Sequence, residues 1–396
     1  MVEGDDPDTT QNKVGFEVKG TAARRGAAAK VWFCASVGLT CGALATCVVL
    51  APKSGASPDM GLAWLLFLGS SVHVASTGWL FTNTNVRRYA REKRGRYVWA
   101  PLGLVATGLI VSVVATPHLM SWAVLLVLAW QLHHFQKQNI GQVALTGVSL
   151  GLAPLRRGER TAICTTGAAG IAAVCAHPAL LQLSLRPPLA GAAVLLATAL
   201  FLLGVAGGAL VLTRRLRSDR SPKFCLMYGL ALLFPLPIFV FGSPYAAVAG
   251  MTLAHGLQYL LLMGLVAAAG EPRERMSGVA ALCTLAALGG VVLNLMSHLH
   301  GDGLPLRPLF GVYLGLLATH FVVDAGIWRL REPFVRAFLS QRIGYLVCSA
   351  RSSGVPMSVA DRSVADIESG TWLEFHGKTL RKLNSAGSGA TPARPR

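Results

Sequence analysis

Charged residues are scarce in this chain of 396 residues, where they make up 14% of the sequence, and only 18 residues are acidic. A soluble globular protein carries about 25% charged residues. Apolar residues make up 53% of the chain and occur in runs of about 20, which is the length that spans a bilayer as a helix. This pattern excludes a disordered chain, a secreted disulfide scaffold and a soluble nucleic-acid-binding domain. It predicts an all-α, polytopic transmembrane bundle.

Several signatures of chemistry are also missing. The eight cysteines include no CxxC pair and lie mostly inside apolar runs, so neither a disulfide framework nor a thiolate metal site is expected. There is no P-loop, no GxSxG and no HExxH, and the HxxxH and HxxHH clusters of membrane desaturases are absent. What remains is a set of histidines within the apolar runs.

The apolar runs predict about ten membrane spans, each flanked by polar or basic connections. They cover residues 31–51, 60–82, 99–117, 119–150, 161–177, 189–212, 224–241, 245–269, 277–296 and 308–330.

The positive charge alternates between the connections. The connection with Arg87, Arg88 and Arg91 is strongly basic, whereas those on the opposite side contain Lys53, Arg186 and little else. Lysine and arginine in short loops mark the cytoplasmic side, so both termini are predicted to be cytoplasmic. The basic excess then orients the chain and meets anionic lipid, and no nucleic-acid partner is expected.

The predicted spans divide the chain into three regions. Residues 1–30 are expected to form a cytoplasmic N-terminal tail that is disordered, residues 31–330 the ten-span domain, and residues 331–396 a partly disordered cytoplasmic C-terminal tail.

Four of the even-numbered spans carry histidines at a common depth. Counted from the outer end of each span, they lie about 10–15 residues in, a spread of roughly 7 Å at the helical rise. Ionisable groups in hydrocarbon are costly and normally face the bundle interior, so each is a candidate site residue. The histidines are His73 in the second span, His133 and His134 in the fourth, His255 in the eighth and His320 in the tenth.

The fourth span has the most polar middle. Gln131, His134 and Gln138 share one helical face, whereas His133 points about 100° away with Lys137 below it. We therefore expect His134 to be the ligand and His133 the second choice. Gln138 is expected to tune the ligands, and Lys137 to reach the cytoplasmic face or neutralise a carboxylate such as Asp324.

The other three histidines also have polar companions. Asp324 follows His320 by four residues, so its carboxylate is placed either to bind a metal or to hold the other ring nitrogen. Tyr259 follows His255 by four residues, and Thr77 follows His73 by four.

Four imidazoles and a carboxylate at one depth predict a shared metal or catalytic centre. Imidazole and carboxylate ligands with open positions suit non-haem iron (Fe2+) best, with copper, zinc or manganese as alternatives. Two other hypotheses for the function stay open. One is a proton-coupled secondary transporter that uses these His and Asp residues as a relay. The other is a haem-binding membrane protein, which is disfavoured because stacked haems need histidine pairs at two depths.

One histidine on each of several membrane helices resembles the bacterial carotene-cleaving dioxygenases of the Brp/Blh type. The resemblance rests on His73, His134, His255 and His320 and on the polytopic architecture. It implies an oxygenase that holds iron with histidines and acts on an apolar isoprenoid. The partners would then be the lipid bilayer and an apolar small-molecule or lipid substrate.

Overall fold

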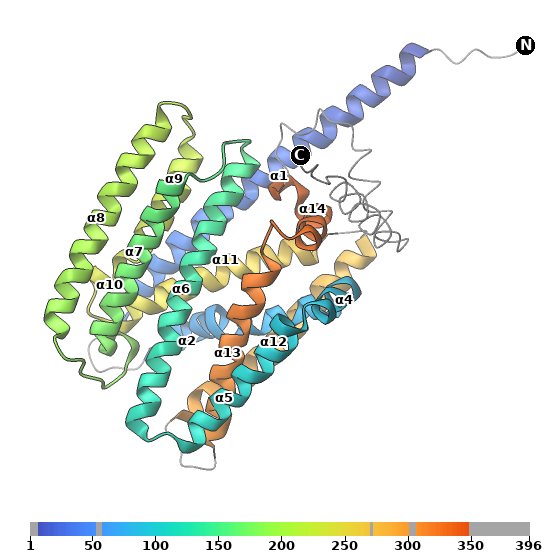
Figure 1. The fold of residues 1–396 in the computed structure, drawn as a ribbon. Coiled ribbons are helices and arrows are strands. Elements are labelled where there is room, and N and C mark those ends of the chain that lie inside the picture. Colours follow the sequence, from blue (N-terminus) through green and yellow to red (C-terminus); the bar gives the residue numbers. More distant parts are fainter. Residues whose placement is uncertain (1–6, 53–57, 270–271, 301–305, 348–396) are drawn as a thin grey trace, which may run out of the picture. The chain divides into compact units, whose positions relative to one another are not determined.

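The computed structural model describes residues 7–52, 58–269, 272–300 and 306–347. These residues belong to the first of two compact units, Met1–Cys348 and Ser349–Arg396. The described part of the chain is all-α and contains no β-strand. Its long helices are α1 (Pro7–Val49), α5 (Ala100–Val114), α6 (Pro117–Ser149), α7 (Arg157–Ala176), α8 (Ala190–Leu216), α9 (Pro222–Leu233), α11 (Gly250–Ala267), α12 (Pro272–Ser297), α13 (Arg307–Ile327) and α14 (Pro333–Val347) (Figure 1).

Shorter helical segments connect or extend these helices. They are α2 (Met60–Phe67), η1 (Leu68–Val72), α3 (His73–Ser76), η2 (Thr77–Thr82), α4 (Thr84–Glu92), η3 (Gly95–Trp99), η4 (Pro178–Leu181), α10 (Leu236–Val240), η5 (Tyr245–Ala249) and η6 (His298–His300).

Helices cover each of the ten segments predicted from the sequence, and seven of the described helices are long and apolar enough to cross a membrane. The other three predicted spans differ for local reasons. The polar stretch around His134 lowers the hydropathy of α6. Helix α7 begins with charged residues. The segment 224–241 is split into α9 and α10 at Pro235, which cannot continue a helix. The seven helices are Gly26–Val49, Met60–Thr82, Gly95–Val114, Ala190–Leu216, Tyr245–Ala267, Arg275–Ser297 and Arg307–Ile327.

The two predicted tails are only partly described. Helix α1 begins at Pro7, so the segment predicted as a disordered N-terminal tail is helical from that residue onward. In the predicted C-terminal tail, Pro333–Val347 form α14, and residues 348–396 lie outside the described residues.

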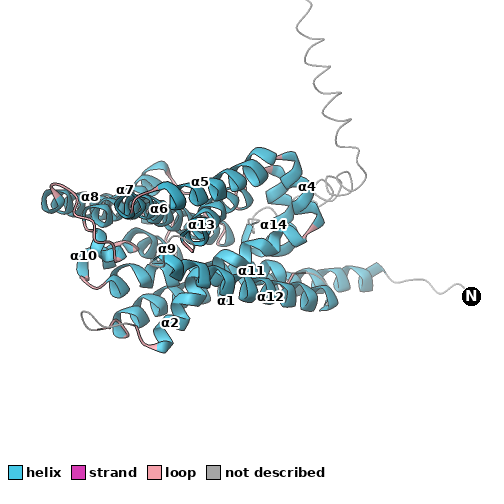
Figure 2. Ribbon diagram, turned by 90° about the horizontal axis from the view of Figure 1, so that it is seen from below, coloured by secondary structure: helices cyan, strands magenta, loops and turns pink. Residues whose placement is uncertain are grey.

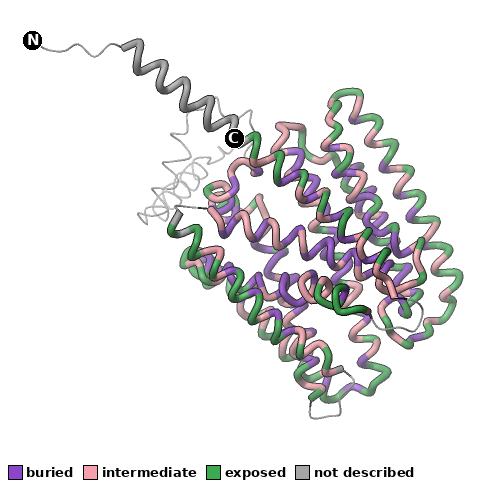
Figure 3. The backbone as a smooth tube through the Cα atoms, turned by 180° about the vertical axis from the view of Figure 1, so that it is seen from behind, coloured by how far each residue is buried: buried purple, intermediate pink, exposed green. Residues whose placement is uncertain are grey.

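The surface of the bundle is apolar and its interior contains polar side chains. In the most apolar 18-residue stretch of Gly95–Val114 only 11% of the residues are buried. Large apolar side chains such as Ile110 and Leu203 are exposed. A soluble monomer rarely exposes such continuous apolar surface, whereas lipid tails match it. Figure 3 shows the buried residues along the inner faces of the helices and the exposed ones outside. These features are those of a multi-pass membrane protein.

The two most buried of these seven helices are Tyr245–Ala267 and Arg307–Ile327. In each, 67% of the residues in the most apolar 18-residue stretch are buried. Helix α11 packs along α1, and α13 packs along α5 (Figures 1 and 2). These two central helices contribute four of the predicted site residues, His255 and Tyr259 on α11 and His320 and Asp324 on α13.

Candidate metal centre

Four imidazoles from four segments of the bundle meet in its interior. His73 comes from α3, His134 from α6, His255 from α11 and His320 from α13, and none is more than 8% exposed. The ring centroids of successive members of the cycle His73, His255, His134 and His320 lie 4.9–5.0 Å apart. Every neighbouring pair is edge-to-face, so the four rings surround one point. We call these residues and Asp324 the histidine cluster.

A local departure from α-helical geometry places His73. The five residues before it, Leu68–Val72, form a π-helical turn, and such turns are frequent at functional sites. The turn lies against α11. A Cβ on Gly256 would clash with the backbone oxygen of Gly69, so the two glycines permit backbone contact. Because Gly256 follows His255 directly, this contact holds the two segments that carry His73 and His255 together.

Two phenylalanines orient the rings. Phe135 stacks on His255 with centroids 4.2 Å apart, and Phe321 stacks on His134 with centroids 4.9 Å apart. Each phenylalanine follows a cluster histidine in sequence but packs on the imidazole of another helix. The cluster is therefore held by cross-helix packing.

A hydrogen-bonded chain determines which nitrogen of His320 carries the proton. Tyr259 donates its hydroxyl to Oδ1 of Asp324 at 2.8 Å. The Tyr259 hydroxyl has one hydrogen, so in its 2.9 Å contact with Thr77 the threonine must donate. Thr77 Oγ1 then accepts from Nδ1–H of His320, at 2.7 Å. In a neutral imidazole this leaves the lone pair on Nε2.

That lone pair faces the second carboxylate oxygen. Oδ2 of Asp324 lies 3.7 Å from Nε2 of His320 and 3.7 Å from Nε2 of His134. The distance is too long for a hydrogen bond. Within the described chain neither Nε2 atom has a hydrogen-bond partner, although both are buried. Acceptors that face each other across this gap repel one another unless a cation lies between them.

The remaining two histidines are also open to a ligand. Neither ring nitrogen of His255 has a hydrogen-bond partner among the described residues, and the same holds for His73. The carbonyls of Gly69 and Ser70 lie beside the His73 ring, outside good hydrogen-bond geometry. Buried polar atoms are normally satisfied, so this concentration of unpaired nitrogens indicates a missing partner.

These atoms have the spacing of a metal site. The ligand atoms of His73, His255 and His320 lie within 4.8 Å of one another, as do those of His134, His320 and Asp324. His320 belongs to both groups, and its Nδ1 is already bonded to Thr77, so only Nε2 is free to bind an ion. The two groups share His320, and these buried His and Asp groups could hold a metal ion.

The other predicted site residues lie outside the cluster. Gln138 donates to the backbone oxygen of His255 and to Oε1 of Gln258, both at 3.0 Å, and so contacts the backbone of a cluster residue. His133 and Lys137 are exposed on a different face of α6. The 100° turn per residue explains why His134 enters the cluster and His133 does not. Among the described residues Lys137 forms no ion pair with Asp324, whose ion-pair partners are His134 and His320.

Sequence reasoning did not assign Thr77 and the two phenylalanines to their partners. Thr77 was expected to accompany His73, four residues before it, but it bonds to His320 instead. The helical turn from Thr77 to Thr82 is of the tighter 3-10 type, which changes the face that Thr77 presents. Phe135 and Phe321 carry no signal in the sequence beyond their position after a histidine.

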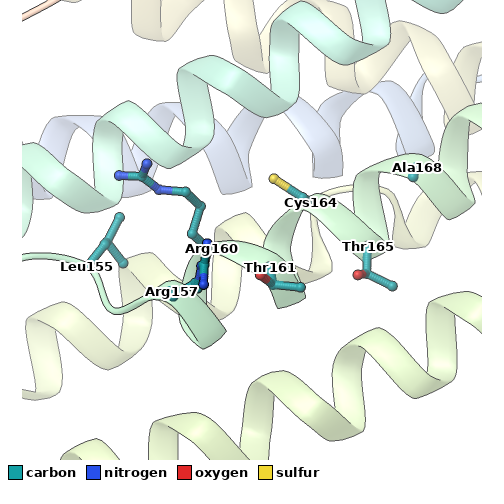
Figure 4. Close-up of a pocket in the computed structure, with 7 residues that line it drawn as sticks. All are labelled: Leu155, Arg157, Arg160, Thr161, Cys164, Thr165 and Ala168. Atoms are coloured by element: carbon teal, nitrogen blue, oxygen red, sulfur yellow. The ribbon is translucent and has the colours of Figure 1, made fainter.

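A separate pocket lies away from the cluster. It has a volume of about 720 Å³ and opens along α7, where Arg157 and Arg160 lie near one end and Cys164 and Ala168 farther along the helix (Figure 4). None of its lining residues belongs to the histidine cluster.

In comparisons with known proteins, no family model matches this chain, and no curated protein or solved structure matches it either.

Proposed function

We propose that this chain is an integral membrane metalloenzyme, a non-haem iron oxygenase that oxidises or cleaves a lipid or isoprenoid substrate. His73, His134, His255 and His320 would hold the ion, with Asp324 as the carboxylate ligand. The observation that carries the proposal is the 3.7 Å separation between Asp324 Oδ2 and the unpartnered Nε2 atoms of His134 and His320. Metal–ligand bonds to imidazole and carboxylate are roughly 2.0–2.2 Å, so one ion fits between such atoms.

Charge supports a cation at this position. Asp324 is buried, and its only ion-pair partners within the described residues are the two histidines. A buried carboxylate without a compensating charge is strongly unfavourable. A divalent ion would provide that charge and also occupy the lone pairs of the imidazoles.

The donor set favours iron over the other metals. Imidazole and carboxylate ligands without thiolate are typical of non-haem iron, although copper, zinc and manganese accept the same donors. When bound, iron in such a site supplies dioxygen activation. Thr77, Tyr259, Phe135 and Phe321 orient the ligands, and the apolar walls of the bundle exclude bulk water. An apolar substrate would reach the bundle laterally from the bilayer.

The ring geometry does not favour haem. A porphyrin needs a flat slot between its two axial histidines, whereas here each imidazole is in edge-to-face contact with two others at about 5 Å. Four rings in mutual contact suit a single ion better than a porphyrin.

We also propose that all ten helical segments cross the membrane and that both termini are cytoplasmic. The support is the alternation of basic connections along the sequence. Fusions of a periplasmic-type phosphatase and of a fluorescent protein to residue 396 test the orientation. Only the fluorescent fusion should be active, and an active phosphatase at that end would contradict it.

The proposed activity is tested on protein purified from iron-supplemented cells. Element analysis identifies the metal, and nitric oxide added under anaerobic conditions should give the EPR signal of a high-spin ferrous nitrosyl. Dioxygen consumption should then depend on an added isoprenoid. Purified protein that takes up no metal would favour the proton-coupled transporter, and a Soret band would indicate haem.

A further inference from the structure

A second group of buried polar side chains adjoins the histidine cluster, where α1, α6 and α11 meet. Gln138 on α6 bonds to the backbone oxygen of His255 and to Gln258, and Gln258 donates to Oγ1 of Thr40 on α1 at 2.7 Å. Thr40 donates in turn to the backbone oxygen of Ser36 at 2.6 Å. Polar contacts thus continue from the cluster into the interface of three helices.

The polar face continues one helical turn further toward the end of α6. Ser36 precedes Thr40 by four residues and Gln142 follows Gln138 by four, so each repeats the face of its neighbour. Asn139 lies beside them on α6. The exposed fractions are 1% for Ser36, 3% for Gln142 and 4% for Asn139. One more turn along α1, Trp32 is 1% exposed.

Each of these four side chains has a buried atom that lacks a hydrogen-bond partner within the described part of the chain. The atoms are Nε1 of Trp32, Oγ of Ser36, Nδ2 of Asn139 and Oε1 of Gln142. We call these four residues, with Thr40, Gln138 and Gln258, the polar seam. A native interior seldom leaves several polar atoms unpaired in one region, so a ligand is expected there.

The chemistry of the seam fits water. The unpaired atoms include donors (Trp32, Asn139), an acceptor (Gln142) and a hydroxyl that is both (Ser36). A buried water needs two to four polar partners of either kind. The seam contains no carboxylate, so a metal ion or another cation would find no charged ligand. An apolar ligand would leave the same atoms unsatisfied.

Helix α14 lies at the end of the seam that Trp32 marks, because Trp32 belongs to the same hydrophobic cluster as buried side chains of α14. Helix α14 packs against α1, α6 and α11, and its side chains Leu339, Ile343 and Leu346 are fully buried there. The seam therefore extends from the histidine cluster to the end of the bundle that α14 closes.

We propose that a chain of ordered water molecules occupies the polar seam and conducts protons between the histidine cluster and the end of the bundle beneath α14. The position of the waters follows from the unpaired atoms. Their use by the cluster rests on the proposed function.

Radiolytic footprinting in isotopically labelled water tests the proposal on the full-length, metal-free protein in lipid nanodiscs. Hydroxyl radicals formed from bound water oxidise the side chains next to it, and tryptophan reacts readily. Phe201 is the control, because it is 3% exposed and stacks on Phe239 away from the seam. The labelling rate of each residue in the folded protein is divided by the rate of the same residue in the unfolded chain.

Trp32 should be labelled several-fold faster than Phe201 on this scale. Equal protection of the two residues would overturn the proposal. The double substitution Ser36→Ala, Gln142→Leu should lower the labelling of Trp32 several-fold, whereas Thr198→Val, which removes a hydroxyl bonded within α8, should leave it unchanged. An undiminished rate in the double variant would also contradict the proposal.

The outcome is independent of metal binding, because the protein is metal-free in this experiment. Protection of Trp32 in a chain that binds iron would contradict the proposed water chain but not the proposed metal centre. Rapid labelling of Trp32 in a chain that binds no metal would support the water chain and contradict the metal centre.

Discussion

Thr77 Oγ1 lies 2.7 Å from Nδ1 of His320, although 243 residues separate them in the sequence. The contact fixes the tautomer of His320 and directs its Nε2 lone pair toward Asp324. Partners of this kind hold ligating histidines in place, and their loss typically lowers metal affinity by 10–100-fold.

Removal of the Thr77 hydroxyl should therefore weaken metal binding without unfolding the chain. We expect Thr77→Val to raise the metal dissociation constant by about 10–100-fold, because His320 loses the acceptor that fixes its ring. Thr77→Ser keeps the hydroxyl and should bind almost as tightly as the parent chain. Competition with a chromophoric chelator measures both constants. Equal affinities for the valine and serine variants would show that Thr77 does not position His320.

Tyr259 satisfies the carboxylate of Asp324 on the side away from the ligands. Tyr259→Phe leaves Oδ1 of Asp324 buried without its donor, which should destabilise the fold by about 1–3 kcal/mol. In Tyr259→Phe combined with Asp324→Leu the unpaired carboxylate oxygen is gone and only the Thr77 contact is lost, so the phenylalanine should cost less than it does in the parent chain. Thermal unfolding in detergent, read on metal-free protein, gives the four values of this cycle. Additive effects would contradict the coupling.

The backbone contact between Gly69 and Gly256 predicts an effect from one methyl group. Gly256→Ala should push the turn that carries His73 away from α11 and so lower both stability and metal content. Gly264→Ala on the same helix meets nothing within 4 Å and should be neutral or slightly stabilising. Metal content per chain and the unfolding temperature report the two effects. A fully loaded Gly256→Ala protein would show that the contact does not hold the cluster.

A buried ion pair at the other side of the bundle supports the fold and not the site. Arg215 contacts both carboxylate oxygens of Glu159, at 2.9 and 3.1 Å, and stacks over Phe224. Arg215→Met leaves Glu159 as an uncompensated buried charge and should destabilise the chain by about 3–5 kcal/mol. Arg214→Met, on the exposed side of α8, should change stability little. Denaturant unfolding measures both, and the folded fraction of each variant should keep its full metal content.

The sequence was sufficient to predict helices over the ten apolar runs and a shared site for the four histidines, whose rings the structure brings together. Apolar runs define helices in a bilayer because every backbone group must be paired within its own segment. The choice of His134 over His133 also followed from helical periodicity alone. In contrast, the partner of Thr77 depends on the π and 3-10 turns around His73, which shift the phase of the helix and leave no pattern in the residue types. The roles of Phe135 and Phe321 depend on which helices are neighbours. The exposure of Lys137 follows from its place on the same helical face as His133. The ion pair with Asp324 that was expected as one alternative for Lys137 is not formed among the described residues.

The neighbouring histidines of α6 provide the most direct test of the metal centre. His133→Ala and His134→Ala remove the same group from adjacent positions, one exposed and one in the cluster. The measurement is the metal content per chain of the two purified variants and the parent, by element analysis after loading with Fe2+. We expect one ion per chain in the parent and in His133→Ala, and a large loss in His134→Ala. Equal metal content in the two variants, or no metal in the parent, would contradict it.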